Sequence, residues 1–196
     1  GLPPKSKGDY AFISHMVEVA KPQSGRVAVV VPHGVLFRGG AEGRIRQRLI
    51  DDNLLDAVIG LPGNLFPTTS IPVAILLFDR ARERGGEREA EDQVLFVDAS
   101  SQFSPAKTKN QMEETHIQHI VAAVRARQGV DKFASLVSRA TITENDYNLN
   151  IPRYVDTYEE EAQIDLAQTE REIDRLEAEL AAVRVKMKQH LKELGL

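Results

Sequence analysis

Residues 54–79 read LLDAVIGLPGNLFPTTSIPVAILLFD, and the rest of the chain is organised around this stretch. Two apolar runs, Leu54–Leu61 and Val73–Phe78, flank a connection rich in Pro, Gly, Asn and Thr. Both runs are short, rich in β-branched residues and bounded by turn formers, which favours strands buried on both faces over helices. Leu65 and Phe66 form an apolar pair inside this polar loop. The pair therefore either packs back onto the core or presents an aromatic ring to a ligand.

The composition is that of a globular chain. The 196 residues suffice for one domain, or for one domain with an appendage, and 42% of them are hydrophobic. Cysteine is absent, which excludes disulfides and thiolate zinc sites. The net charge of −4 argues against a protein that wraps nucleic acid by itself, but it leaves room for a subunit that contacts nucleic acid locally.

The start of the chain is unusual. Residues 1–8, GLPPKSKG, resemble the middle of a loop and lack an initiator Met, so we expect an excised fragment. No leader segment is recognisable, and the longest apolar stretch, Val27–Phe37, is too short for a bilayer span. We therefore expect a cytoplasmic protein with no membrane partner.

Helical and extended patterns alternate along the chain. Helices are expected over Asp9–Ala20 with Asp9 as N-cap, Ala41–Asp52 and Thr115–Gln128, and further strands over Arg26–Val31 and Gln93–Asp98. The continuous apolar run RVAVVV predicts a central parallel strand. Residues 131–140 are expected to be helical or mixed, and residues 148–154 extended, because Pro152 prevents a helix. The order fits one α/β half of a doubly wound sheet, with crossover helices first and a strand hairpin at the end.

A run of charges, Arg80–Asp92, separates two of the expected strands. Its arginines would suit a loop that contacts phosphate. The mixed charges favour a solvated, mobile connection instead.

The last forty residues change character. Apolar residues recur every seven positions, with partners three positions later, over about four heptads. This seam comprises Leu166, Ile173, Leu176, Leu180, Val183, Met187 and Leu194. A long amphipathic, coiled-coil-like helix is predicted, packed on the parent domain, on another subunit or on a copy of itself. We therefore divide the chain into an α/β part (1–100), a connecting region (101–156) and an assembly helix (157–196).

Most patterns typical of catalytic or cofactor sites are missing. No Gly-x-Gly-x-x-Gly sequence follows a strand and no Walker loop is present, so no nucleotide cradle is predicted. His116 and His119 lie three apart on an expected helix but lack a third ligand, so no metal site is predicted.

Two weaker candidates lie after the first expected strand. His33 ends this strand at the carboxyl edge, where open α/β sheets place ligands, although a polar residue solvating the strand end explains it equally well. The pair Gly39-Gly40, flanked by Arg38 and Arg44, could hold a phosphate at a helix N-terminus or simply let the chain turn.

Four stretches together resemble the methylation (M) subunit of type I restriction–modification systems, and they cover nearly the whole chain. They are GLPPKSKGDYAFISHM, GRVAVVVPHGVLFRGGAEGRIRQRLI, LLDAVIGLPGNLFPTTSIPVAILLFD and ENDYNLNIPRYVD. The resemblance implies later strands of a Rossmann-like sheet and adenine-specific methylation of DNA at N6, with S-adenosylmethionine as methyl donor. It also implies three partners: a specificity subunit, a restriction subunit and DNA.

The resemblance places the family's glycine-rich cofactor loop and its Asn-Pro-Pro-Phe tetrad upstream of the region that matches Gly1. The segment Leu2-Pro3-Pro4 is not that tetrad, because the Asn and the following aromatic are absent. No catalytic residue is therefore expected in this chain, S-adenosylmethionine is expected to bind only the parent, and the fragment is expected to be inactive alone.

The resemblance also assigns roles to the central loop and to the tail. In related amino-methyltransferases the aromatic of a Gly-x-x-Phe-Pro loop stacks on the flipped base; here that role falls to Phe66, with Asn64 and Pro67 beside it. The C-terminal helix is expected to join the specificity subunit, or to form a homodimer when that partner is missing. Two alternatives stay open: a non-catalytic module that assembles through its coiled coil, and an unrelated α/β enzyme that uses the His33 edge.

Overall fold

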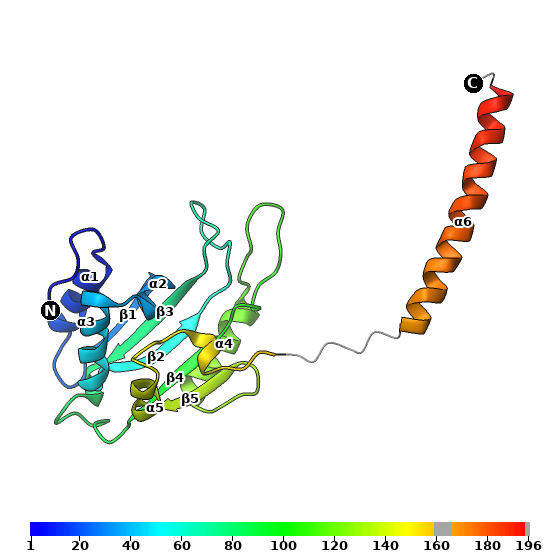
Figure 1. Cartoon of the computed structure of the whole chain (residues 1–196). Helices are drawn as coiled ribbons and strands as arrows, with labels where there is room; N and C mark the ends of the chain where they lie inside the picture. The colour runs from blue at the N-terminus through cyan, green and yellow to red at the C-terminus, as the bar shows by residue number, and fades with distance from the viewer. Residues whose placement is uncertain (159–165, 195–196) are drawn as a thin grey trace. The chain divides into compact units, whose positions relative to one another are not determined.

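The computed structural model describes residues 1–158 and 166–194 (Figure 1). The chain divides into two compact units, Gly1–Tyr158 and Glu159–Leu196. The first unit is a five-stranded sheet of order β1-β3-β2-β4-β5 with helices on its faces. Its elements are α1 (Asp9–Val19), β1 (Arg26–Pro32), α2 (Gly34–Phe37), α3 (Gly40–Asp51), β2 (Leu55–Gly60), β3 (Val73–Asp79), η1 (Arg80–Arg82), β4 (Gln93–Asp98), α4 (Glu114–Ala126), β5 (Ala134–Ser138), α5 (Arg139–Glu144) and η2 (Ile151–Arg153). The second unit contains α6 (Leu166–Glu193). No described helix is both long and apolar enough to cross a membrane.

The two apolar runs of the central stretch form β2 and β3, which pair antiparallel, and the predicted α/β class is confirmed. β2 also pairs with β4 in parallel, so the carboxyl ends of β2 and β4 lie at one edge of the sheet. The expectation of a central parallel strand at Arg26–Val31 is wrong for the described sheet. β1 lies at the edge of the sheet and its strand partner, β3, runs antiparallel to it.

The two faces of the sheet are covered unequally. One face packs against α1 and α3, through residues that include Tyr10, Ile13, Ile45 and Ile50. The other face packs against α4 through Ile120 and Ala123, mainly over β2 and β4. Beside α4 an open apolar groove of about 450 Å³ remains over β1 and β3, and Val30 of β1 is 52% exposed. Burial on both faces is therefore right for β2, whereas alternate residues of β3 are only half-buried.

Three local expectations are corrected by the structure. Residues 134–138 form strand β5, which pairs with β4, and α5 begins at Arg139, so the helical alternative for residues 131–140 is wrong and the mixed one is confirmed. Pro152 lies inside the 3-10 turn η2, because an early helical position needs no N–H donor. The N-cap of α1 is Gly8 rather than Asp9, whose carboxylate binds Arg38 instead.

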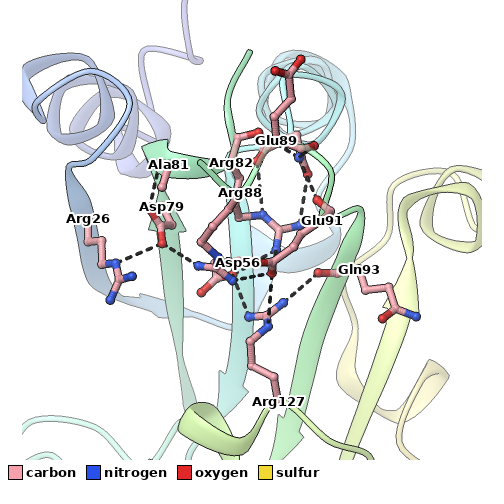
Figure 2. A network of polar contacts seen from close by, with 11 residues as sticks. Arg26, Asp56, Asp79, Ala81, Arg82, Arg88, Glu89, Glu91, Gln93 and Arg127 are labelled. Carbon is pink, nitrogen blue, oxygen red and sulfur yellow. Dashed lines mark hydrogen bonds and ion pairs between the residues drawn. The ribbon is translucent and has the colours of Figure 1, made fainter. Parts of the chain in front are cut away.

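The charge run 80–92 is only partly a solvated connection: Glu87, Glu91 and Asp92 are exposed, but the run also contains buried and half-buried arginines. It begins with η1 and folds over the end of the sheet where β2 starts and β3 finishes (Figure 2). Arg82 is fully buried, with its guanidinium bound to Asp56 and to the side-chain oxygen of Asn53. Arg88 spans from Asp56 to Asp79. The prediction missed the structural part of this run because Arg82 and Arg88 bind carboxylates at the strand ends, which periodicity cannot show.

These ion pairs shift the pKa of several groups. Burial lowers the pKa of Arg82, while the nearby Asp56 carboxylate opposes that shift. Hydrogen bonding to Arg88 lowers the pKa of Glu91, and the same contact raises the pKa of Arg88. The charged forms of Glu91 and Arg88 are therefore favoured. Burial disfavours the charged form of Arg82, and the nearby Asp56 carboxylate offsets part of that penalty.

The buried hydroxyl of Tyr10 is expected to make the free energy of unfolding fall at alkaline pH. Burial raises the pKa of its hydroxyl from 10.0 to about 12, and the hydroxyl donates a hydrogen bond to the carbonyl oxygen of Val35 (2.9 Å). Because the folded state holds this proton more tightly, its contribution is complete below pH 10 and is lost as the pH rises to about 12.

The Tyr10→Phe variant cannot ionise at this position. We expect it to be less stable at neutral pH by about 1 kcal/mol, through the lost hydrogen bond, but to lose less stability than the parent above pH 10. Urea denaturation across this pH range measures the difference. Parallel curves for the two proteins would contradict it.

Candidate functional site

Two loops meet at the edge of the sheet where β2 and β4 end. One connects β2 to β3, and the other connects β4 to α4 (Figure 1). We call residues 63–70 the Phe66 loop. Open α/β sheets bind ligands at the carboxyl ends of their parallel strands, so this edge is the candidate location of a binding site.

Leu65 and Phe66, the apolar pair of the central stretch, have different environments. Leu65 packs against the core cluster that includes β2, β4 and α4. Phe66 is 38% exposed, and Pro67 and Thr68 after it are exposed as well. One residue thus anchors the loop from below while the next presents its ring at the surface.

The base of the Phe66 loop is held by the second loop. The ammonium of Lys109 donates to the side-chain oxygen of Asn64 (2.9 Å) and to the carbonyl oxygen of Thr69 (3.2 Å). The side-chain amide of Asn110 donates to the carbonyl oxygen of Gly63 (2.9 Å), and its backbone N–H donates to that of Asn64 (3.0 Å). We call Lys109 and Asn110 the clamp.

The other predicted site residues lie apart from Phe66 or are already engaged. The imidazole Nε2 of His33 lies 3.2 Å from the carbonyl oxygen of Val73, at the same edge of the sheet. The guanidinium of Arg38 is bound by Asp9 and Glu42, whereas Arg44 is exposed on α3. In the described part of the chain no hydrogen bond or ion pair joins either arginine to the Phe66 loop.

The two helix-borne histidines have separate structural contacts. His116 Nδ1 accepts the backbone N–H of Glu113 at the start of α4. His119 stacks on the ring of Phe133, with the ring centroids 4.1 Å apart, and contacts Gln102. Within residues 1–158 and 166–194 no group of three or more His, Cys, Asp or Glu side chains could hold a metal ion.

The family model described as N-6 DNA Methylase matches residues 1–163. This chain belongs to the N-6 DNA methylase family. Among its relatives, the MpnII methylase subunit of a type I restriction enzyme from Mycoplasma pneumoniae is 34% identical over 98% of this chain. The MjaVIII methylase subunit from Methanocaldococcus jannaschii is 31% identical over the whole chain. The predicted resemblance to M subunits is confirmed.

Solved structures agree with the family assignment. The methyltransferase subunit of a type I restriction–modification system from Streptococcus thermophilus superposes with a TM-score of 0.74, at 48% identity over 80% of this chain. The EcoKI M protein shares the fold, with a TM-score of 0.63 at 20% identity. The chain spans 34% and 33% of the two curated relatives, and 32% of the Streptococcus structure.

The sequence patterns did not predict the clamp. Lys109 and Asn110 lie in a polar stretch without hydrophobic periodicity, and their partners in the Phe66 loop are 40 or more residues away along the chain. The one usable signal was Asn64, a residue type that tolerates a positive φ; its φ is 59°. The sequence patterns also did not predict the structural role of three arginines that all pair with Asp56. They are Arg82 and Arg88 in the charge run, and Arg127 at the end of α4.

Proposed function

We propose that this chain forms the target-base side of a type I restriction–modification methylase that methylates adenine in DNA at N6. Family membership supports the chemistry, and the placement of Phe66 supports the role of this part. β1, β3 and β2 would be late strands of the parent's methyltransferase sheet. The free edge of β1 and the apolar groove beside α4 would then adjoin the rest of the parent.

The observation that carries this proposal is the partial exposure of Phe66 (38%) at the tip of an anchored loop. An enzyme that modifies a base must take it out of the stack and hold it in a pocket. Stacking on an aromatic ring contributes about 1–3 kcal/mol per base, which offsets a good part of the unstacking free energy. His33, at the same edge, would line the border of that pocket.

The methyl donor of the parent would be S-adenosylmethionine, as the family implies. The loops at the candidate edge do not fit its binding, because none of them has a glycine-rich cradle of the Gly-x-Gly-x-x-Gly type. We therefore assign both cofactor binding and the catalytic tetrad to the part of the parent that this chain does not span. By itself the chain would be inactive.

The Phe66→Ala variant in the full-length subunit, assembled with its specificity subunit, tests this role. We expect kcat for methylation to fall about tenfold to a hundredfold, through the lost stacking. The fluorescence of 2-aminopurine at the target adenine, which reports an unstacked base, should fall as well.

The matched control is Ile71→Ala, because Ile71 is also apolar and exposed (62%) and lies just after the same loop. It should leave both measurements unchanged. Normal methylation and normal fluorescence in Phe66→Ala would refute the stacking role.

Helix α6 supports a second part of the proposal, assembly with the specificity subunit. The described apolar residues of the seam are exposed along this helix of 28 residues, from Ile173 (51%) to Met187 (52%), and Leu194 (75%) follows directly after the helix. The side chain of Leu166 lies outside the described residues. Contiguous exposed apolar surface of this kind marks an interaction site. A coiled-coil homodimer of the chain is the alternative use of the same surface, and a restriction subunit would join in the complete system.

A further inference from the structure

We infer that Lys109 and Asn110, the clamp, are positioning residues that fix the direction in which the Phe66 ring faces the target base. The inference rests on the proposed function of Phe66. It adds a role for the loop between β4 and α4, which is otherwise only a connection between two elements.

The clamp holds both sides of the base of the Phe66 loop. The ammonium of Lys109 joins Asn64 on the incoming side to Thr69 on the outgoing side. Asn110 holds the incoming side twice, once through its side chain and once through its backbone. The backbone N–H of Asn64 also donates to the carbonyl oxygen of Ser70, which closes the base of the loop (3.0 Å). The clamp therefore acts on the base, and residues 65–68 at the tip are left to present the ring.

Without the clamp, the Phe66 loop is held by the packing of Leu65 on the core and by two backbone hydrogen bonds within the loop, Asn64 to Ser70 and Thr69 to Phe66 (3.4 Å). The two backbone bonds fix the shape of the loop but do not tie it to another part of the chain. Lys109 and Asn110 add polar contacts from a second loop, which fix the Phe66 loop relative to its surroundings. Stacking requires the ring to be parallel to the base, so a small change in direction would lower the fraction of productive complexes.

The alternative role for Lys109 is a contact with a DNA phosphate, and the two roles predict different kinetic effects. Both of its described partners are neutral oxygen atoms, so its positive charge has no described carboxylate partner. A lysine in this position could instead bind a DNA phosphate. Such a contact would strengthen DNA binding in a salt-dependent way, whereas a positioning residue affects the step after binding.

The experiment compares Lys109→Met and Asn110→Ala in the full-length subunit assembled with its specificity subunit. We expect both variants to lower kcat about tenfold and to weaken 2-aminopurine fluorescence at the target adenine, with KM for DNA and the salt dependence unchanged. Lys109→Arg keeps a cationic donor and should restore a large part of the loss. Thermal melting should be unchanged, because the clamp lies on surface loops.

The matched control is Lys107→Met, which removes the same charge from the same loop, where no described contact links it to the Phe66 loop. It should behave like the parent. Unchanged kcat and fluorescence in both clamp variants would overturn the inference. The inference would also be overturned if Lys109→Met raised KM for DNA while Asn110→Ala left kcat and fluorescence unchanged, because that pattern identifies a phosphate contact. If Phe66→Ala is itself silent, the proposed function fails; if only the clamp variants are silent, the proposed function stands and this inference fails.

Discussion

Replacing Asp56 by alanine is expected to lower the free energy of unfolding by about 3–5 kcal/mol, because removing one partner of a buried ion pair leaves the other charge uncompensated. One oxygen of this carboxylate accepts hydrogen bonds from Arg82 (3.1 Å), Arg88 (3.0 Å) and Arg127 (2.7 Å) (Figure 2). The side chain of Arg82 is completely buried, so its positive charge would have no solvent to replace the lost partner. Urea denaturation followed by circular dichroism measures the change.

The matched control is Asp52→Ala. Asp52 also pairs with an arginine, Arg48, but both side chains are more than half exposed and the atoms lie 3.6 Å apart. Exposed pairs contribute little, so we expect a change below about 0.5 kcal/mol. An Asp56→Ala protein as stable as the Asp52→Ala control would show that the three arginines are satisfied by other partners.

The second large effect is expected on α6. Placing glutamate at both Leu180 and Met187 should abolish co-purification of the full-length subunit with its specificity subunit. Both side chains lie on the exposed apolar seam, at 50% and 52% exposure, and two charges there would have to be desolvated on assembly. Pull-down from a co-expressing strain measures the loss, and circular dichroism confirms that the helix still forms.

A control on the same helix separates the seam from the helix as a whole. Ala178 and Val185 lie seven residues apart on the face away from the seam, and both are exposed. The double variant Ala178→Glu, Val185→Glu adds the same charge and should still co-purify. Loss of the partner in both double variants, or in neither, would contradict the assignment of the seam. Light scattering of the chain alone tests the homodimer alternative.

The strands were predictable because burial leaves a direct mark on sequence. Leu54–Leu61 and Val73–Phe78 are continuous apolar runs bounded by turn residues, and both contain strands. The order in which the strands pair was not predictable, because an apolar run carries no information about which strand lies beside it. β1 was therefore expected at the centre of the sheet and lies at its edge.

Part of the site was predictable for a different reason. Phe66 could be singled out because an aromatic in a polar loop is unusual and the surrounding motif resembles a known family. The sequence could not show that Leu65 packs against the core cluster while Phe66 keeps 38% of its surface exposed, since the two are adjacent and both apolar. The clamp, and the ion pairs of Asp56 with its three arginines, join residues that are far apart in sequence and that only folding brings together.

The outer edge of β1 has a consequence for anyone who handles this chain. A strand at the end of a sheet presents unpaired N–H and C=O groups, and β1 does so next to an uncovered apolar face. Such an edge is a template for further strands, whether these come from the remainder of the parent or from identical chains in a concentrated solution. The same seven residues that would join the two parts of a methylase are thus the place where the isolated chain would begin to aggregate.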